Sequence, residues 1–355
     1  MYKSRSLLTA FSFVLAVSAL TGCSSANANT QGTASSTAPA TVSAEVSETE
    51  TIPEQANSEP LSVVCTIFPE YDWVKEILGE HIENAELTYL LDSGVDLHSY
   101  QPTTDDIMKI SACDLFVYVG GESDEWVEDA LAEATNKDMK VINLMDVLGD
   151  SAKVEELKEG MQDEDEDEHE HEHEEDEIEY DEHVWLSLKN AKVLCAEIEK
   201  NIEAIDPANA ADYKANLDSY TAKLSDLDSN FQTLVDASSV KTLVFGDRFP
   251  FRYFVDDYSL DYYAAFIGCS AETEASFETI AFLADKVKEL NCDTVFTLEN
   301  SDKSIAETII STSGKSADIA ELNSLQSVSD DEIAGGTSYL SLMQKNYDVL
   351  SDVLK

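Results

Sequence analysis

The chain has 355 residues, with 22 basic and 72 acidic side chains, and its formal net charge at pH 7 is −50. This charge excludes nucleic acid and anionic membrane surfaces as electrostatic partners, and it makes the surface attractive to cations. The six cysteines show no C-x-x-C spacing, which argues against a disulfide scaffold and against a thiolate zinc site.

The first residues predict export and lipid anchoring. Lys3 and Arg5 precede an apolar run over residues 7–20, which has the length of a signal-peptide core and is too short for a permanent membrane span. The run ends in Leu-Thr-Gly-Cys23, the pattern of a bacterial lipobox, in which the cysteine is lipidated and becomes the first mature residue. We expect a signal peptide over 1–22 and an extracytoplasmic protein anchored to the cell membrane through Cys23. Which membrane holds the anchor stays open.

Residues 23–60 are rich in Ser, Thr, Ala and Glu and poor in large apolar residues. Such a segment cannot bury enough surface to offset the entropy of ordering, so it predicts a disordered tether. The remaining chain is long enough for two ordinary domains.

The next part of the chain alternates between strand-like and helix-like patterns. Strands are expected at 61–67, 87–91, 114–119 and 140–144. Between them we expect helices that end at Gly79, open with a capping box of Thr103 and Asp106, and run from a Ser123 cap to about Ala134. An acidic, His-rich loop over 160–180 follows.

Two long helices with one apolar face come next. The first covers 187–206 and ends at Asp206-Pro207, and we expect it to link two halves of the protein. The second carries an apolar stripe from Tyr213 to Leu234, which is typical of a helix that faces a core.

The alternation then resumes. Strands are expected at 243–246, 262–267, 294–298 and 317–322, and helices at 249–258, 275–290, 304–313 and after a Thr337 cap. The predicted fold class is α/β, with two βα (Rossmann-like) lobes joined by one long helix and a metal cleft between them. The expected N-terminal lobe covers 61–186 and the C-terminal lobe covers 207–355.

The positions of the histidines carry the most information about function. His98 lies in a loop that leaves a strand and enters a helix cap, and His183 lies just before the linking helix. Both are expected at the carboxyl edge of the first parallel sheet, where such sheets bind ligands. Neutral imidazole is a preferred nitrogen donor for zinc, so we predict that both are metal ligands.

Four segments resemble a known family, the zinc and manganese substrate-binding proteins of ABC importers whose lobes are joined by one rigid helix. They are Thr66-Ile-Phe-Pro69, Gly94-Val-Asp-Leu-His98-Ser-Tyr-Gln-Pro102, Asp181-Glu-His183-Val-Trp185-Leu and Tyr339-Leu-Ser-Leu-Met-Gln-Lys-Asn346. The resemblance covers residues 61–355 and implies metal binding by His98 and His183. It also implies a monomer that captures zinc and delivers it to the permease of an ABC importer, though which permease stays open.

The remaining ligands are less clear from the sequence. The family usually places a histidine (for zinc) or a glutamate (for manganese) shortly after the first strand of the second lobe, and no histidine follows His183 here. Asp247, at the end of that strand, is the expected third ligand, with helix capping as its alternative role. For the fourth position we expect Glu299, while Glu321, Asn323 and water stay open.

Two further features bear on metals and thiols. The acidic run contains His169, His171 and His173, which predict a secondary, low-affinity metal site on exposed imidazoles. Cys269 and Cys292 lie near predicted strand ends, and whether they pair stays open.

We expect zinc as the bound ion, with manganese as the alternative, because the His-rich run favours zinc. A surface adhesin with an incidental metal site is a second candidate function. A metallohydrolase is not favoured, because no general base or oxyanion donor accompanies the predicted ligands, so we do not expect an enzyme.

Overall fold

The computed structural model describes residues 60–162, 179–270 and 274–355. The predicted signal peptide, the lipidation site Cys23, the tether and the three histidines of the acidic run lie outside the described residues. Within the described parts, no helix is both long and apolar enough to cross a membrane.

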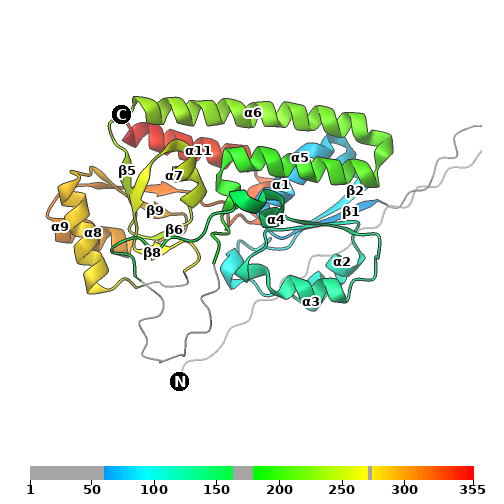
Figure 1. Ribbon diagram of the computed structural model, residues 1–355, viewed down its shortest axis with the longest axis horizontal. Helices are drawn as coiled ribbons and strands as arrows, with labels where there is room; N and C mark the ends of the chain where they lie inside the picture. Colours follow the sequence, from blue (N-terminus) through cyan, green and yellow to red (C-terminus); the bar gives the residue numbers. More distant parts are fainter. Residues whose placement is uncertain (1–59, 163–178, 271–273) are drawn as a thin grey trace, which may run out of the picture. The chain divides into compact units, whose positions relative to one another are not determined.

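The first lobe is built on four parallel strands in the order β2-β1-β3-β4 (Figure 1). The strands are β1 (Leu61–Cys65), β2 (Ala85–Tyr89), β3 (Leu115–Tyr118) and β4 (Lys140–Asn143). The helices that follow them are α1 (Phe68–Leu78), α2 (Thr104–Ala112), α3 (Trp126–Ala132) and α4 (Leu144–Leu148). The apolar side chains of β1 and β3 are buried, as expected for the centre of a parallel sheet that is covered on both faces.

The helix starts of this lobe follow the sequence in part. Thr103 and Asp106 form the predicted capping box of α2. The prediction that Ser123 caps the next helix is wrong: Glu125 is the N-cap of α3, and Ser123 lies in a preceding 3₁₀ turn. The chain reaches that turn through Gly120 and Gly121, whose φ angles of 89° and 88° only glycine adopts readily.

The second lobe contains three pairs of parallel strands. They are β5 (Thr242–Val244) with β7 (Asp261–Tyr263), β6 (Arg248–Phe249) with β8 (Phe266–Ile267), and β9 (Thr294–Leu298) with β10 (Asp318–Leu322). A parallel bridge between Phe245 and Phe296 joins the first and third pairs. The helices are α7 (Arg252–Tyr258), α8 (Phe277–Glu289), α9 (Ser304–Ser313), α10 (Asp330–Ala334) and α11 (Tyr339–Val353). The predicted architecture of two βα lobes is confirmed.

Several boundaries differ from prediction; for example, the strand predicted at 262–267 is divided into β7 and β8. α7 begins at Arg252 instead of Phe249, because residues 248–249 pair with β8 before the helix starts. α11 is capped by Ser338, whose hydroxyl accepts a hydrogen bond from the Ser341 N–H, and not by Thr337.

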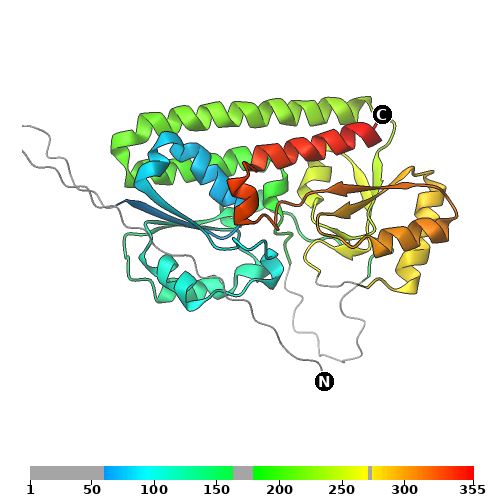
Figure 2. The same cartoon turned by 180° about the vertical axis from the view of Figure 1, so that it is seen from behind.

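The two long helices pack against different parts of the protein. α5 (Leu188–Ile205) packs against α1 and α4 of the first lobe. α6 (Ala210–Ala237) packs against α1 and α5 and also against α7 and α11 of the second lobe, so it extends over both sheets (Figures 1 and 2). The division of the chain at 187–206 stays a prediction.

A large hydrophobic core runs through both lobes, and the second lobe also has a small core of its own that includes Leu283 and Val295. At the centre of the large core, the Trp185 indole donates a hydrogen bond to the Ser324 carbonyl (2.8 Å), and the Tyr339 hydroxyl donates one to the Trp185 carbonyl (2.7 Å). All three residues are almost completely buried. Because a shared core resists hinge motion, the lobes are held in a fixed relation at this point.

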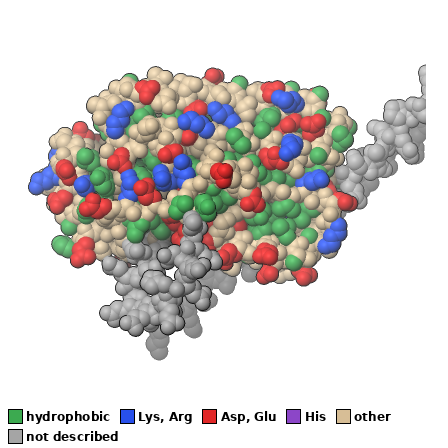
Figure 3. Space-filling view, in the orientation of Figure 1, with side chains coloured by type: hydrophobic (Ala, Val, Ile, Leu, Met, Phe, Trp, Pro, Cys, Tyr) green, Lys and Arg blue, Asp and Glu red, His purple; other side chains and the backbone are tan. Residues whose placement is uncertain are grey.

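The surface is strongly acidic in places. In the view of Figure 3, acidic side chains lie along the lower edge, over α2 and α3. Glu125, Glu128 and Asp129 of this region are exposed. This distribution favours the approach of cations to the first lobe.

Candidate metal centre

His98 is held by the turn in which it sits. It lies in a 3₁₀ turn (Leu97–Ser99) whose N-cap, Asp96, accepts a hydrogen bond from the His98 N–H (3.1 Å). Its Nδ1 lies 2.7 Å from the Ser123 hydroxyl and 3.5 Å from a Glu182 carboxylate oxygen. The ring is therefore oriented from its Nδ1 side, and Nε2 points away from these partners.

His183 is held in the same manner by one carboxylate. Asp181 Oδ1 accepts the His183 backbone N–H (2.9 Å) and lies 3.1 Å from its Nδ1. The His183 side chain is completely buried. A carboxylate acceptor at Nδ1 is common behind zinc-binding histidines, because it orients the ring so that Nε2 can face a metal.

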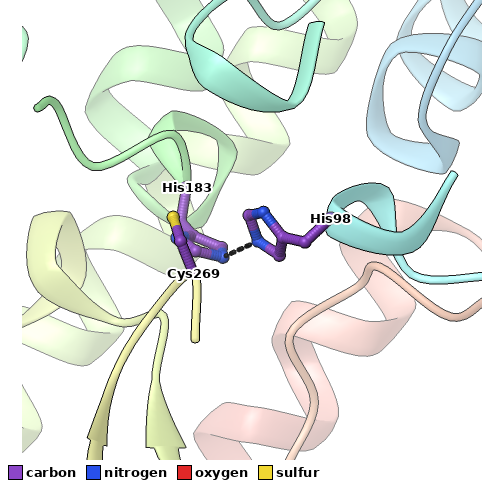
Figure 4. Close-up of side chains that lie close together, drawn as sticks. All are labelled: His98, His183 and Cys269. Atoms are coloured by element: carbon purple, nitrogen blue, oxygen red, sulfur yellow. Dashed lines mark hydrogen bonds between the residues drawn. The ribbon is translucent and has the colours of Figure 1, made fainter. Parts of the chain in front are cut away.

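The two predicted histidines meet through their Nε2 atoms, which lie 3.2 Å apart (Figure 4). Two donors bound tetrahedrally to one zinc ion at about 2.0–2.1 Å are separated by about 3.3 Å. Burial, followed by the neighbouring His183, lowers the pKa of His98 to about 3, so its ring is neutral at ordinary pH. The spacing and the neutral state both suit a shared metal ion.

A third donor comes from the second lobe. Cys269 follows β8, and its Sγ belongs with one nitrogen of each of His98 and His183 to a group of atoms that lie within 4.8 Å of one another (Figure 4). Burial, and then Glu155, raise the pKa of its thiol well above the usual value. Cys269 and Cys292 are both free thiols, so the disulfide left open by the sequence does not form in this structure.

Gln326 of the second lobe lies against Asp96 and His183. Both Asp96 oxygens lie 3.0 Å from one end of its amide, so the amide nitrogen must face Asp96 and the amide oxygen must face His183 Nε2 at 2.8 Å. The carboxylate of Asp96 also forms an ion pair with Arg248 of β6. In this orientation the Gln326 amide oxygen accepts a hydrogen bond from His183 Nε2, and a metal ion bound at Nε2 would replace that proton.

The two predicted carboxylate ligands are engaged elsewhere. Asp247 Oδ1 accepts from the Arg248 N–H (2.9 Å), and Oδ2 accepts from the Leu298 N–H (3.1 Å). Glu299 accepts from the N–H and the hydroxyl of Ser324 at 2.7 and 2.6 Å. Within the described part of the chain, neither carboxylate belongs to the donor group that includes the two histidines.

Two glycines limit what the second lobe can place near the site. A Cβ at Gly246, which follows β5, would lie 2.6 Å from Ala306 Cα on α9. A Cβ at Gly268 would lie 2.9 Å from the His183 ring. The backbone of the chain after β8 is thus pressed against the histidine itself.

Replacing Gly268 with alanine should weaken metal binding without removing a donor. The new methyl group must displace the His183 ring or the strand end, and disturbing the support of a metal-binding histidine costs about 10- to 100-fold in affinity. A competition titration with a chromophoric chelator measures this. Denaturant unfolding of the metal-free variant separates a local effect from general destabilisation, and an unchanged metal affinity would contradict the expectation.

The family described as ZnuA, Zinc-uptake complex component A periplasmic, matches residues 63–353. The chain belongs to this family. The resemblance that the sequence motifs suggested is therefore confirmed.

Individual relatives of this chain are named for zinc uptake or zinc binding. The high-affinity zinc uptake system protein ZnuA of Bacillus subtilis is 31% identical over 299 residues, covering 84% of this chain and 89% of the relative. Zinc-binding protein AdcA of Streptococcus pyogenes is 28% identical over 294 residues, covering 82% of this chain and 55% of AdcA. The chain thus spans about half the length of the AdcA relatives it matches.

Solved ZnuA-family structures share the fold. The Zn(II)-bound ZnuA-like domain of Streptococcus pneumoniae AdcA matches with a TM-score of 0.63 at 27% identity, over 83% of this chain and 98% of that domain. The metal-dependent lipoprotein YcdH of Bacillus subtilis matches with a TM-score of 0.65 at 28% identity, over 83% of this chain and 99% of that protein.

Sequence reasoning missed Cys269 and Gln326 as members of the site. The available signal for Cys269 was its place after Tyr262–Ile267, a predicted strand, directly behind a glycine. Gln326 follows β10 closely, so it too lies at the carboxyl edge of the second sheet.

Proposed function

We propose that this protein captures zinc outside the cytoplasm and delivers it to the permease of an ABC importer. The observation that carries the proposal is the meeting of His98 and His183 Nε2 atoms at 3.2 Å, each ring backed by an acidic side chain. Membership of a family described as a component of a zinc-uptake complex supports the same conclusion.

The choice of zinc over manganese rests on chemistry and on relatives. Two imidazole ligands suit zinc, whereas manganese favours sites dominated by oxygen donors. The relatives ZnuA and AdcA are named for zinc, and one solved relative contains Zn(II).

The proposal includes an anchored, monomeric binding component that is not an enzyme. The predicted lipidation of Cys23 would hold it at the cell membrane beside its permease, and membrane fractionation of a Cys23→Ser variant tests this anchor. One relative, AdcA of Streptococcus pneumoniae, is named a zinc-binding lipoprotein, which supports the anchor. Size-exclusion chromatography with light scattering tests the monomer.

Zinc titration of the purified full chain should show one tight site. That site should survive deletion of residues 163–176, whereas the weaker zinc binding predicted for His169, His171 and His173 should be lost, because the deletion leaves His98 and His183 in place. Isothermal calorimetry in the presence of a competing chelator measures both the tight zinc site and the weaker zinc binding. If tight binding disappears with the deletion, the cleft is not the transport site and a metal buffer becomes the better description.

Transport itself has a separate test. Cells that lack the protein should grow poorly when zinc is chelated and recover when zinc, but not manganese, is restored. Rescue by manganese alone would favour the manganese alternative. Normal growth in chelated medium together with lost surface attachment would favour the adhesin.

A further inference from the structure

Cys269 lies where a ligand from the second lobe is needed. It follows the last residue of β8 by two positions, and its Sγ lies within 4.8 Å of one ring nitrogen of each of His98 and His183. Figure 4 shows the three side chains converging from three separate segments of the chain. Residues that converge in this way from distant segments are typical of a metal site.

A close contact between Gly268 and the His183 ring fixes the position of the chain after β8. Gly268 lies so near His183 that even a Cβ there would come within 2.9 Å of the ring. The next residue, Cys269, is therefore held beside the ring by the backbone and not by a flexible side chain. Its own N–H lies 3.4 Å from a Glu155 carboxylate oxygen of the first lobe.

The competing carboxylates would have to give up existing bonds to bind a metal. Asp247 accepts two backbone N–H bonds, and Glu299 accepts two bonds from Ser324. A metal bound by either carboxylate would leave these donors without their present partners, which is unfavourable. Cys269 is not in a disulfide, and apart from one hydrogen bond with the Glu182 backbone its Sγ already lies in the donor group with one nitrogen of each histidine.

We propose that Cys269 supplies a thiolate as the third metal ligand, giving a site of two imidazoles and one sulfur. This inference rests on the proposed zinc-binding function and specifies its donor set. Thiolate ligands favour zinc and other soft ions and disfavour manganese, so Cys269 determines the metal selectivity of the site. When zinc binds, the thiol loses its proton to solvent and the sulfur forms the metal bond, with no change in oxidation state.

Cobalt(II) substitution tests the sulfur ligand directly. One equivalent of Co(II) added to the reduced full chain should produce a thiolate-to-cobalt charge-transfer band in the near ultraviolet. The band should vanish in Cys269→Ser and persist in Cys292→Ser, a matched control because Cys292 packs against the small core of the second lobe. It should also persist in Asp247→Asn, which tests the competing ligand.

Zinc affinity gives the second measurement. Cys269→Ser should bind zinc more than about 100-fold more weakly, beyond the usual effect of losing a group behind a ligand. Cys269→Asp, which replaces sulfur with oxygen, should lower the ratio of zinc to manganese affinity. Unfolding of each metal-free variant should match the wild-type protein, which shows that the fold is intact.

The outcomes separate this inference from the proposed function. Tight zinc binding without the charge-transfer band, or with a band that survives in Cys269→Ser, overturns the thiolate ligand and leaves the zinc function standing. Loss of tight binding in Asp247→Asn but not in Cys269→Ser returns the third position to Asp247. If the wild-type chain binds no zinc tightly, the proposed function fails as well.

Discussion

Replacing His183 with alanine should lower zinc affinity by more than about 100-fold, the upper range for losing a group that only supports a ligand. The His183 ring is completely buried and is oriented by Asp181 through both its backbone N–H and its Nδ1. Its Nε2 faces His98 at 3.2 Å, so the substitution removes the donor at the centre of the site.

Competition with a chromophoric chelator measures this loss. His81→Ala is the matched control, because His81 forms an exposed contact with Asp212, belongs to no candidate donor group among the described residues and should leave zinc affinity unchanged. His98→Ala should reproduce the loss with less effect on stability, since His98 is less buried than His183. A loss of less than tenfold in both site variants would place the tight site elsewhere.

Replacing Glu70 with glutamine should make the protein more stable than wild type at pH 8.5 and leave it nearly unchanged at pH 5. Glu70 is completely buried, and its Oε2 accepts bonds from the Thr66 N–H and hydroxyl and from the Ile67 N–H. Its Oε1 has no partner among the described residues. Burial, and then Asp124, raise the pKa of Glu70 to about 8.

Proton linkage gives the direction in which the free energy of unfolding changes with pH. In the unfolded chain Glu70 ionises near its usual pKa of 4.5, whereas in the folded protein it keeps its proton until about pH 8. The unfolded state therefore binds fewer protons between these values, and the free energy of unfolding falls as the pH rises through this window. The full loss is on the order of 5 kcal/mol, since the pKa rises from 4.5 to about 8, and glutamine, which resembles the protonated acid, avoids it.

Urea unfolding at pH 5 and pH 8.5 measures both proteins. Asp124, whose pKa burial raises to about 7, acts in the same direction, so the variant should keep part of the pH dependence. Glu80→Gln, at an exposed position, is the control and should follow wild type at both pH values. Parallel pH profiles for the Glu70 variant and wild type would contradict the raised pKa.

The sequence could predict what depends on local pattern. The parallel strands of the first lobe follow from short apolar runs separated by amphipathic helices, and loops after such strands must meet at one edge of the sheet. This is why His98 and His183, 85 residues apart, could be expected near one another. The fold class needed no more than this alternation and is confirmed.

The second lobe was harder because its strands are very short. β6 and β8 contain two residues each, so their apolar pattern is too brief to distinguish a strand from a helix start. Their pairing with each other is a long-range event that decides where Cys269 emerges. A sequence motif reveals a cysteine ligand only when cysteines are clustered. Cys269 is a single cysteine that follows His183 by 86 residues, so no spacing pattern marks it as a ligand.

The role of Ser123 was missed for a related reason. A serine before an apolar run looks like a helix cap, but here its hydroxyl lies 2.7 Å from His98 Nδ1 and its N–H is bonded to Glu182. Polar side chains near a site serve whichever partner the fold brings closest, and local propensity does not contain that information.

The contact between Gly246 and α9 restricts how this protein could be redesigned. A histidine grafted immediately after β5, where relatives are expected to carry one, would drive its Cβ to within 2.6 Å of the Ala306 backbone and force the whole helix aside. An engineer who wants a third imidazole here should begin at position 269, where the side chain already lies within 4.8 Å of a nitrogen of each histidine. In this protein a new ligand is therefore easier to accommodate after β8 than after β5.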